Sequence, residues 1–364
     1  MKKIVLFING LSSGGAERQL CELANGLAER GYCITITTYS DTIDHYKYNE
    51  LVKRKRIAPR ASKFVKILGI WKYFLTLEAD WVITFGQRAS FFCLIPLYLF
   101  SQNKIHVIAG ERFNTIGKPS IQEKILMAYL YKRVDYIVPN SYSQRKHIIT
   151  TKPIYEAKTI TITNYTDLSH YKKTPLPNGK KLRIIVVGRY NEQKNGLLFV
   201  EAVNKLKNDS KCDFVIEWYG NQHYKDTFPN PYYVEMQNKV NEYGLGSILV
   251  LNDHVKDIAS VLAHFDVFCL PSLWEGFSNA LGESICCGRP CLVSDVSDNG
   301  LMVKHGINGF LFNPKDINSI VEAFQKFFML DKKDRILMGN ASRKRAEELF
   351  NYKVFIDAYV NLVG

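Results

Sequence analysis

The sequence contains no long apolar run. The longest one, Phe91–Phe100, has ten residues and includes Pro96, whereas a helix that crosses a bilayer needs about 20 apolar residues. The run near the amino terminus, Ile4–Ile8, is too short for the apolar core of a secretory signal. We therefore expect neither a transmembrane segment nor a signal peptide, and a protein that works in the cytoplasm, in solution or on a membrane surface.

Paired cysteine motifs are also absent. The eight cysteines lie mostly within apolar stretches, and no histidine or cysteine at the spacing of a zinc site accompanies Cys286, Cys287 and Cys291. This distribution is typical of small buried residues in a reducing compartment. It argues against a disulfide-stabilised protein and against a zinc site.

Acidic residues are scarce in one half of the chain. Residues 1–175 contain 26 Lys and Arg against 13 Asp and Glu, whereas residues 176–364 contain 22 of each, so the first half carries the whole net charge of +13. The length of 364 residues and the hydrophobic fraction of 46% indicate two globular domains and exclude disordered, collagen-like and coiled-coil proteins. The basic first half indicates an anionic partner.

The positive charge gathers in the segment Val52–Leu75, where basic residues alternate with aromatic and aliphatic ones. This amphipathic pattern is typical of contact with an anionic membrane surface or an anionic polymer, and the alternative is a solvated helix that covers a core. We expect no nucleic-acid partner, because the segment contains no recognised nucleic-acid-binding module and the second half is neutral. The candidate membrane contacts are Lys53, Arg54, Lys55, Arg56, Arg60, Lys63, Lys66, Trp71 and Lys72.

Short apolar runs alternate with helical patterns in both halves, which predicts an α/β fold of two doubly wound parallel-sheet domains. The breaker-rich stretch 174–181 would link a domain of residues 1–173 to one of residues 182–347. Ligands of such sheets bind at the carboxyl ends of the strands, so we expect the site in the cleft between the domains. The expected strands are Lys3–Asn9, Ile34–Tyr39, Trp81–Thr84, His106–Ala109, Tyr136–Pro139, Leu182–Gly188, Phe214–Tyr219, Ile248–Leu251, Val267–Pro271 and Cys291–Ser294.

One motif follows the first strand in each half of the chain. The glycine-rich turn Gly10–Gly15 precedes a predicted helix, whose free N–H groups and dipole favour a phosphate, although an ordinary tight turn is the alternative. After the strand that opens the second half, Arg189 and Lys194 stand five residues apart. Arg can bind two phosphate oxygens with its planar fork, while Lys supplies a movable point charge. A solvated loop is the alternative here.

A third motif carries two acids, Glu275 and Glu283, with seven residues between them. Glu275 lies in a loop just after a strand, and Ser278 or Asn279 can cap the helix that carries Glu283. The N–H groups at such a helix start can hold a phosphate while the carboxylates accept hydroxyl hydrogen bonds. Acids in the first turns of a helix are also ordinary dipole stabilisation, but Gly276 and the following Gly-x-Pro make the combination specific.

Four segments together resemble the bacterial members of glycosyltransferase family 4, which have the two-domain GT-B fold built from Rossmann-like domains. They are GGAER at 14–18, VVGRYNEQKNG at 186–196, EGFSNALGE at 275–283 followed by CCGRP, and HGINGFLFNP at 305–314. The resemblance spans nearly the whole chain. It is closest to enzymes that extend lipid-linked oligosaccharides for O-antigen, capsule or glycoprotein glycans.

The resemblance implies how the donor would be held. Arg189 and Lys194 would neutralise the nucleoside diphosphate as it leaves, Glu275 would contact the donor sugar, and Glu283 would hold the ribose hydroxyls. The family uses no divalent metal, and in agreement the chain contains no Asp-x-Asp, the metal-binding element of the other main glycosyltransferase architecture. Further backbone donors to phosphate and sugar would come from Gly14, Gly15, Phe277, Ser278 and Asn279.

Two positions depart from the family pattern. Many members carry a histidine near the donor sugar after the strand His106–Ala109, where this chain has Gly-Glu-Arg-Phe-Asn at 110–114. Either Arg112 replaces that histidine or Glu111 assists the acceptor hydroxyl. Asp253 stands where the nucleobase loop usually has glycine, so base recognition by His254 or its neighbours stays open.

The resemblance thus implies a retaining transferase that moves a sugar from a nucleotide-diphosphate donor, with UDP favoured, to a lipid-pyrophosphate-linked glycan at the inner face of the cell membrane. It also implies that residues from about 348 to 364 form a helix that completes the first, acceptor-binding domain, while residues 182–347 bind the donor. The alternatives are a sugar-nucleotide epimerase or phosphorylase of the same fold, and a non-catalytic protein that binds an anionic polymer.

Overall fold

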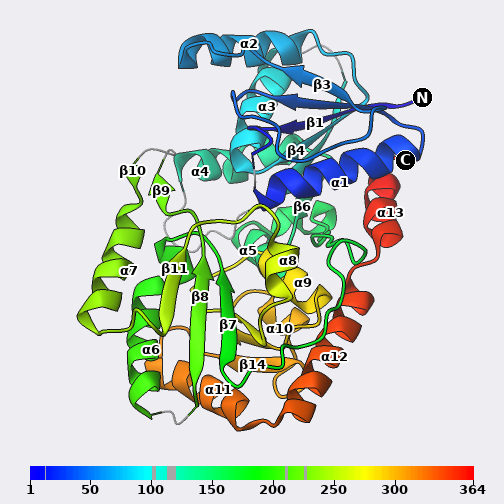
Figure 1. Cartoon of the computed structure of the whole chain (residues 1–364). Coiled ribbons are helices and arrows are strands. Elements are labelled where there is room, and N and C mark those ends of the chain that lie inside the picture. Colours follow the sequence, from blue (N-terminus) through cyan, green and yellow to red (C-terminus); the bar gives the residue numbers. More distant parts are fainter. Residues whose placement is uncertain (13, 101–103, 113–119, 210–211, 225–227) are drawn as a thin grey trace. The chain divides into compact units, whose positions relative to one another are not determined.

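A computed structural model describes the chain apart from residues 13, 101–103, 113–119, 210–211 and 225–227 (Figure 1). It divides the chain into two compact units, one of residues 1–165 with 352–364 and one of residues 166–351. Each unit is built on one six-stranded sheet whose paired strands are parallel. The predicted α/β fold with two doubly wound sheets is therefore confirmed.

The first sheet has the strand order β3-β2-β1-β4-β5-β6, so the chain changes direction across the sheet on either side of β1. Its strands are β1 Lys3–Ile8, β2 Cys33–Thr38, β3 Lys53–Arg56, β4 Trp81–Phe85, β5 His106–Glu111 and β6 Tyr136–Pro139. The helices of this unit are α1 Gly15–Glu29, α2 Lys63–Leu75, α3 Gln87–Phe100, α4 Ile121–Ala128, α5 Tyr142–Thr151 and α13 Tyr352–Val363, with 3-10 helices η1 Leu130–Arg133 and η2 Pro153–Lys158.

Helices cover both faces of this sheet, which is why β1 is an almost continuous apolar run. Ile4 and Leu6 face a core shared with α1 and α13, whereas Val5 and Phe7 face a second core shared with α2 and α3. The last helix of the chain, red in Figure 1, therefore packs beside the first helix, α1.

The second sheet has the strand order β11-β8-β7-β12-β13-β14. Its strands are β7 Leu182–Val187, β8 Phe214–Tyr219, β11 Leu249–Asn252, β12 Val267–Leu270, β13 Cys291–Ser294 and β14 Gly309–Phe312, and a small hairpin pairs β9 His223–Tyr224 with β10 Phe228–Pro229. Its helices are α6 Gly196–Asp209, α7 Pro231–Glu242, α8 Ile258–Leu262, α9 Asn279–Cys286, α10 Asn299–Met302, α11 Ile317–Met329 and α12 Lys332–Leu349, with the 3-10 helix η3 Glu192–Lys194.

The unit boundaries differ from the predicted ones. The chain passes from the first unit to the second after Tyr165, not through a linker at 174–181, and it returns at Tyr352 rather than near residue 348. Two guanidinium groups explain the difference, that of the buried Arg289 and that of the half-buried Arg343. Arg289 donates to the Thr174 hydroxyl at 2.8 Å and Arg343 to the Tyr171 carbonyl at 3.0 Å, so this stretch is tied to the second unit.

The basic segment Val52–Leu75 is not a single helix, so the alternative of one solvated helix over its whole length is wrong. Residues 53–56 form the edge strand β3, which pairs with β2, and the helix α2 starts only at Lys63. Between them, Ala58 and Arg60 adopt left-handed φ angles of 43° and 58°, which no helix can accommodate. The side chain of Ser62 caps α2 by accepting a hydrogen bond from the Val65 N–H.

Candidate active site

The acidic and basic residues of the second unit meet at the carboxyl edge of its sheet. Lys194, from the turn after β7, donates to Glu275 Oε1, from the loop after β12, over 2.5 Å. Both side chains are largely buried, with 11% and 8% of their surface exposed. A buried ion pair is costly to separate once formed. Arg189, by contrast, is exposed just past the end of β7.

Local contacts fix the position of this ion pair. A Cβ atom on Gly188 would come within 3.0 Å of the Lys194 methylenes, so the glycine leaves room for the lysine side chain to lie along the backbone. On the other side, the Ser272 hydroxyl donates to Glu275 Oε1 at 2.6 Å. The Glu275 N–H donates to the hydroxyl of Ser297 at 3.1 Å. Lys194 and Ser272 thus hold the carboxylate, and Ser297 holds the backbone of the same residue.

Two further interactions brace the loop that carries Glu275. Gln193 donates from its side-chain amide to the Trp274 carbonyl at 3.0 Å and accepts from the Leu273 N–H at 2.8 Å. Ser297 has a left-handed φ of 52°. Sequence reasoning missed Gln193, Ser272 and Ser297, because serines and glutamines in loops carry no spacing signal that separates them from ordinary polar residues.

The helix α9 follows this loop as the motif predicts. The Ser278 side chain caps it by accepting from the Leu281 N–H, so Asn279 is the first helical residue. Glu283 lies in the second turn and is buried. Phe277 is buried too, with its ring edge-on to Phe350 at a centroid distance of 6.3 Å. The structure thus brings both motif carboxylates to one end of the second sheet.

His254 lies at the carboxyl end of β11, where its ring is exposed. Its backbone N–H donates to Asp253 Oδ1 at 2.8 Å, and the Gln222 N–H donates to the same oxygen at 3.2 Å. Partial burial raises the pKa of Asp253, but these hydrogen bonds outweigh it and hold the pKa below its usual value. A charged carboxylate therefore stands beside His254.

In the first unit, the glycine-rich turn leads directly into α1. Gly14 is the N-cap and Gly15 the first helical residue, and Gly14 has no side chain with which to cap the helix. The turn rests on the loop after β2. Thr42 accepts a hydrogen bond from the Leu11 N–H at 3.2 Å, and a Cβ on Gly10 would collide with the hydroxyl oxygens of Thr42 and its neighbour Ser40.

The two candidates after β5 have different surroundings. Glu111 has only 1% of its surface exposed, and its carboxylate oxygens accept from the Tyr131 hydroxyl and from the Gln144 amide. Burial raises its pKa to about 8, so it is mostly protonated at neutral pH. Glu111 is thus enclosed by other side chains and largely uncharged. Phe113 and Asn114 lie outside the described residues.

Arg112 is held on two sides. Its Nη2 donates to the Tyr359 hydroxyl on α13 at 2.7 Å, and its guanidinium carbon lies 4.3 Å from the centroid of the Phe85 ring. Tyr359 is fully buried. The contact joins positions 247 residues apart, so no pattern in the sequence points to it.

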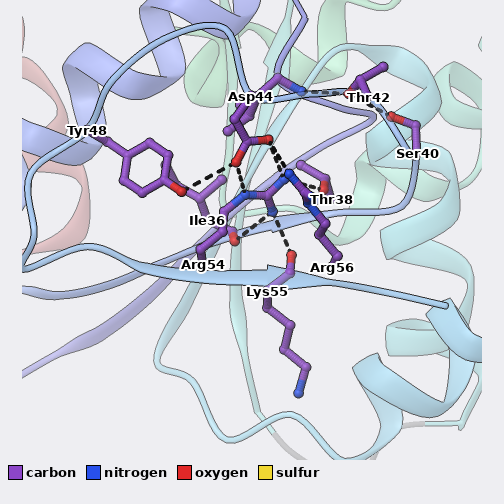
Figure 2. Close-up of polar contacts among 10 residues, drawn as sticks. Ile36, Thr38, Ser40, Thr42, Asp44, Tyr48, Arg54, Lys55 and Arg56 are labelled. Carbon is purple, nitrogen blue, oxygen red and sulfur yellow. Dashed lines mark hydrogen bonds and ion pairs between the residues drawn. The ribbon is translucent and has the colours of Figure 1, made fainter. Parts of the chain in front are cut away.

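The basic segment is partly neutralised by two aspartates, Asp44 and Asp41. Arg54 forms a two-point contact with Asp44 at 2.9 and 3.0 Å, and Arg56 reaches the same carboxylate at 3.1 Å (Figure 2). Lys66 donates to Asp41 at 2.6 Å. The Arg54 side chain is only 15% exposed. It is therefore not available as a membrane contact, contrary to the prediction. Its guanidinium serves to tie the loop after β2 to strand β3.

The remaining surface of α2 is apolar and basic. Ile70 and Phe74 anchor the helix in the core, while Phe64 and Leu68 are 69% and 50% exposed. Arg60 is exposed and Trp71 is half-buried. Four lysines have no ion pair among the described residues and are exposed: Lys53, Lys55, Lys63 and Lys72.

Among the described residues, none of the helices is both long and apolar enough to cross a membrane. Within the same residues, no three or more His, Cys, Asp or Glu side chains are grouped so that they could hold a metal ion.

Known proteins resemble the chain along nearly its whole length. Residues 13–170 match the family model "Glycosyltransferase Family 4", and residues 181–329 match "Glycosyl transferases group 1". The chain is 26% identical to N-acetylgalactosamine-N,N'-diacetylbacillosaminyl-diphospho-undecaprenol 4-alpha-N-acetylgalactosaminyltransferase of Campylobacter jejuni, over 100% of both chains. It is 27% identical to UDP-Gal:alpha-D-GlcNAc-diphosphoundecaprenol alpha-1,3-galactosyltransferase of Escherichia coli, over 71% of this chain and 68% of that protein.

Solved structures agree on the fold. Sucrose-phosphate synthase from Thermosynechococcus elongatus superposes with a TM-score of 0.81 at 17% identity, covering 100% of this chain and 98% of that chain. Anabaena HepE in complex with UDP and glucose also superposes with a TM-score of 0.81, at 15% identity and with 99% of both chains covered. This chain therefore has the two-domain GT-B fold. With both family domains present in order on this fold, the chain belongs to the family 4 glycosyltransferases.

Proposed function

We propose that this protein is a retaining, metal-independent glycosyltransferase that moves a hexosyl or N-acetylhexosaminyl group from a UDP-sugar to a lipid-diphosphate-linked glycan of a bacterial surface polysaccharide. The observation that carries the proposal is the ion pair between Lys194 and Glu275, held at the carboxyl edge of the second sheet with the exposed Arg189 nearby in sequence. The names of the relatives from Campylobacter and Escherichia coli, which act on diphospho-undecaprenol substrates, support the acceptor class.

The proposed chemistry follows from the charges at that edge. As the sugar–phosphate bond breaks, negative charge develops on the departing diphosphate, and cations aimed at that charge lower the barrier. Lys194 is bound to Glu275, and the donor diphosphate would draw its ammonium group away. This exchange would free the Glu275 carboxylate to bind the donor sugar, while Ser272 keeps the carboxylate in place and Ser297 its backbone. Arg189 would complete the phosphate contacts without a metal ion.

The other donor contacts follow the family pattern. Glu283 would accept hydrogen bonds from the ribose hydroxyls, and His254 with its charged neighbour Asp253 would lie near the base. Backbone N–H groups of Phe277, Ser278 and Asn279 would bind phosphate and sugar, because they lie at the start of α9, where such groups have no partner within the helix. Gly14 and Gly15, at the start of α1, would bind the diphosphate in the same way.

We further propose that the first unit docks on the inner face of the cell membrane through α2 and β3. The exposed Phe64 and Leu68 would enter the headgroup region while Lys63 and Lys72 on the same helix pair with anionic lipid. Peripheral attachment of this kind brings an enzyme to an acceptor that cannot leave the bilayer.

The test is a transfer assay with a panel of UDP-sugars and prenyl-diphosphate-linked glycans, with EDTA present and with the product's anomeric configuration read by NMR. Retention with activity in EDTA is the expected result. Glu275→Ala, Arg189→Ala and Lys194→Ala should each lower kcat roughly 100-fold or more. Lys239→Ala is the matched control, because Lys239 forms an equally short ion pair with Glu201 between α7 and α6.

Three outcomes would overturn the proposal. They are a chain that neither binds UDP nor transfers sugar to any acceptor, an inverted product, and equal rates for all variants. Consumption of the UDP-sugar without an acceptor would instead identify an epimerase or phosphorylase.

A further inference from the structure

Arg112 has the environment of a ligand-binding cation rather than of a structural one. Among the described residues its Nε has no hydrogen-bond partner, although solvent does not reach that atom. A shielded N–H of a charged group without a partner is costly and rare, and it is found where a ligand completes the contact. The residue follows β5 directly, at the edge of the sheet where ligands of doubly wound folds bind.

The structure restricts the orientation of this guanidinium. The Phe85 ring covers one face of its plane at 4.3 Å, and the Tyr359 hydroxyl accepts from Nη2 at 2.7 Å. Phe85 is also fixed, because β4 and β5 pair it with Gly110, two residues before Arg112. Of the five N–H donors of the side chain, Tyr359 takes one, and a planar fork remains for an oxyanion.

Tyr359 in turn is set by the packing of α13. It is fully buried, its ring meets Phe355 edge-on at 5.6 Å, and it belongs to the core that α13 shares with α1 and β1. Its hydroxyl therefore has little freedom to follow Arg112, and the arginine must adapt to it. Tyr359 therefore determines the position of the Arg112 guanidinium, as a positioning residue does.

We infer that Arg112 binds a phosphate oxygen of the lipid-linked diphosphate acceptor and that Tyr359, from the last helix, is the positioning residue that holds its guanidinium in the binding orientation. The inference rests on the proposed function for the identity of the acceptor. We assign the oxyanion to the acceptor because Arg112 lies in the first unit, which carries the basic segment proposed to dock on the membrane. The predicted donor contacts lie mainly in the second unit. A guanidinium presents a flat pair of donors that suits phosphate.

The experiment compares two hydroxyl deletions on one helix. Tyr359→Phe removes the acceptor for Arg112 and keeps the ring. Tyr352→Phe is the matched control, because the Tyr352 hydroxyl, also on α13, donates to the Glu22 carbonyl on α1 at 3.2 Å. Farnesyl diphosphate serves as the lipid-diphosphate probe and UDP as the donor-site probe, both measured by calorimetry. Transfer to a prenyl-diphosphate glycan and to an alkyl glycoside without phosphate is measured in parallel.

We expect Tyr359→Phe to weaken farnesyl diphosphate binding about tenfold, with UDP binding unchanged and with thermal unfolding shifted no more than in Tyr352→Phe. The KM for the diphosphate acceptor should rise, while the rate with the alkyl glycoside stays the same. Arg112→Lys keeps the charge but loses the fork, and the double variant with Tyr359→Phe should be no weaker than Arg112→Lys alone.

The inference fails if the wild-type protein transfers sugar but does not bind farnesyl diphosphate, if Tyr352→Phe lowers its binding as much as Tyr359→Phe, or if Tyr359→Phe weakens binding equally in the Arg112→Lys background. A wild-type protein that neither binds UDP nor transfers sugar sinks the proposed function itself, which is a different result.

Discussion

The four exposed lysines of the basic segment allow the free energy of membrane binding to be estimated from the structure. The Asp44 and Asp41 carboxylates neutralise Arg54, Arg56 and Lys66. This leaves Arg60 and four lysines exposed and without an ion pair among the described residues: Lys53, Lys55, Lys63 and Lys72. Each lysine near an anionic surface contributes about 1 kcal/mol. Replacing all four with glutamine should therefore cost about 4 kcal/mol, which corresponds to binding roughly 1000-fold weaker.

The measurement is co-sedimentation with vesicles of phosphatidylglycerol and phosphatidylethanolamine at low and high salt. The wild-type protein should bind in proportion to anionic lipid and lose affinity as salt rises, since exposed charges are screened over about 10 Å at 0.1 M. Phe64→Ser with Leu68→Ser should weaken binding to the same extent at both salt concentrations, because burial of apolar surface does not depend on screening.

A matched variant separates location from total charge. It removes four exposed lysines of the second unit, so its net charge equals that of the first variant: Lys180, Lys207, Lys333 and Lys344. Vesicle binding of this variant should stay within about threefold of the wild type. Equal loss in the two variants, or binding that ignores anionic lipid, refutes the docking surface.

Three further predictions concern single side chains. Ser272→Ala removes a hydrogen bond to the Glu275 carboxylate and should lower kcat about tenfold in the transfer assay, with UDP affinity unchanged. The pKa of Glu111 rises from its ordinary 4.5 to about 8 on folding. The folded chain therefore keeps a proton that the unfolded chain loses between these values, and stability falls as pH rises through that window. Glu111→Gln should abolish the decline in urea melts at pH 5 and pH 8. Asp44→Asn removes the carboxylate that pairs with the largely buried Arg54 guanidinium. It should lower the free energy of unfolding of the first unit by about 2 kcal/mol, measured in a urea melt.

The sequence predicts those strands and helices that a regular pattern of apolar residues marks. The central strands, β1 and β7 among them, are apolar runs with helices after them, because strands covered on both faces contain few polar residues. The same reasoning predicts Lys194 and Glu275 at one sheet edge, since both follow parallel strands. That they pair directly, over 2.5 Å, is set by Gly188 and Ser272 and carries no spacing signal.

The sequence does not predict a strand made of charged residues, nor a contact between residues far apart in the chain. The strand β3 reads Lys-Arg-Lys-Arg, with no apolar position to mark it, and it exists because its backbone pairs with β2 while Asp44 neutralises Arg54. The contact between Arg112 and Tyr359 spans 247 residues. Only the packing of α13 against the first unit brings these two together, and no local rule encodes that packing.

The return of the chain to its first unit also orders the folding of the protein during synthesis. The second unit is one continuous stretch, residues 166–351, so it can fold as soon as it leaves the ribosome. The first unit must wait with the core on one face of its sheet incomplete, because Phe355, Ile356 and Tyr359 fill the space beside α1. During this interval apolar side chains beside α1 stay exposed to solvent. A slow step in translation after residue 351 would lengthen the interval in which the nascent chain can aggregate.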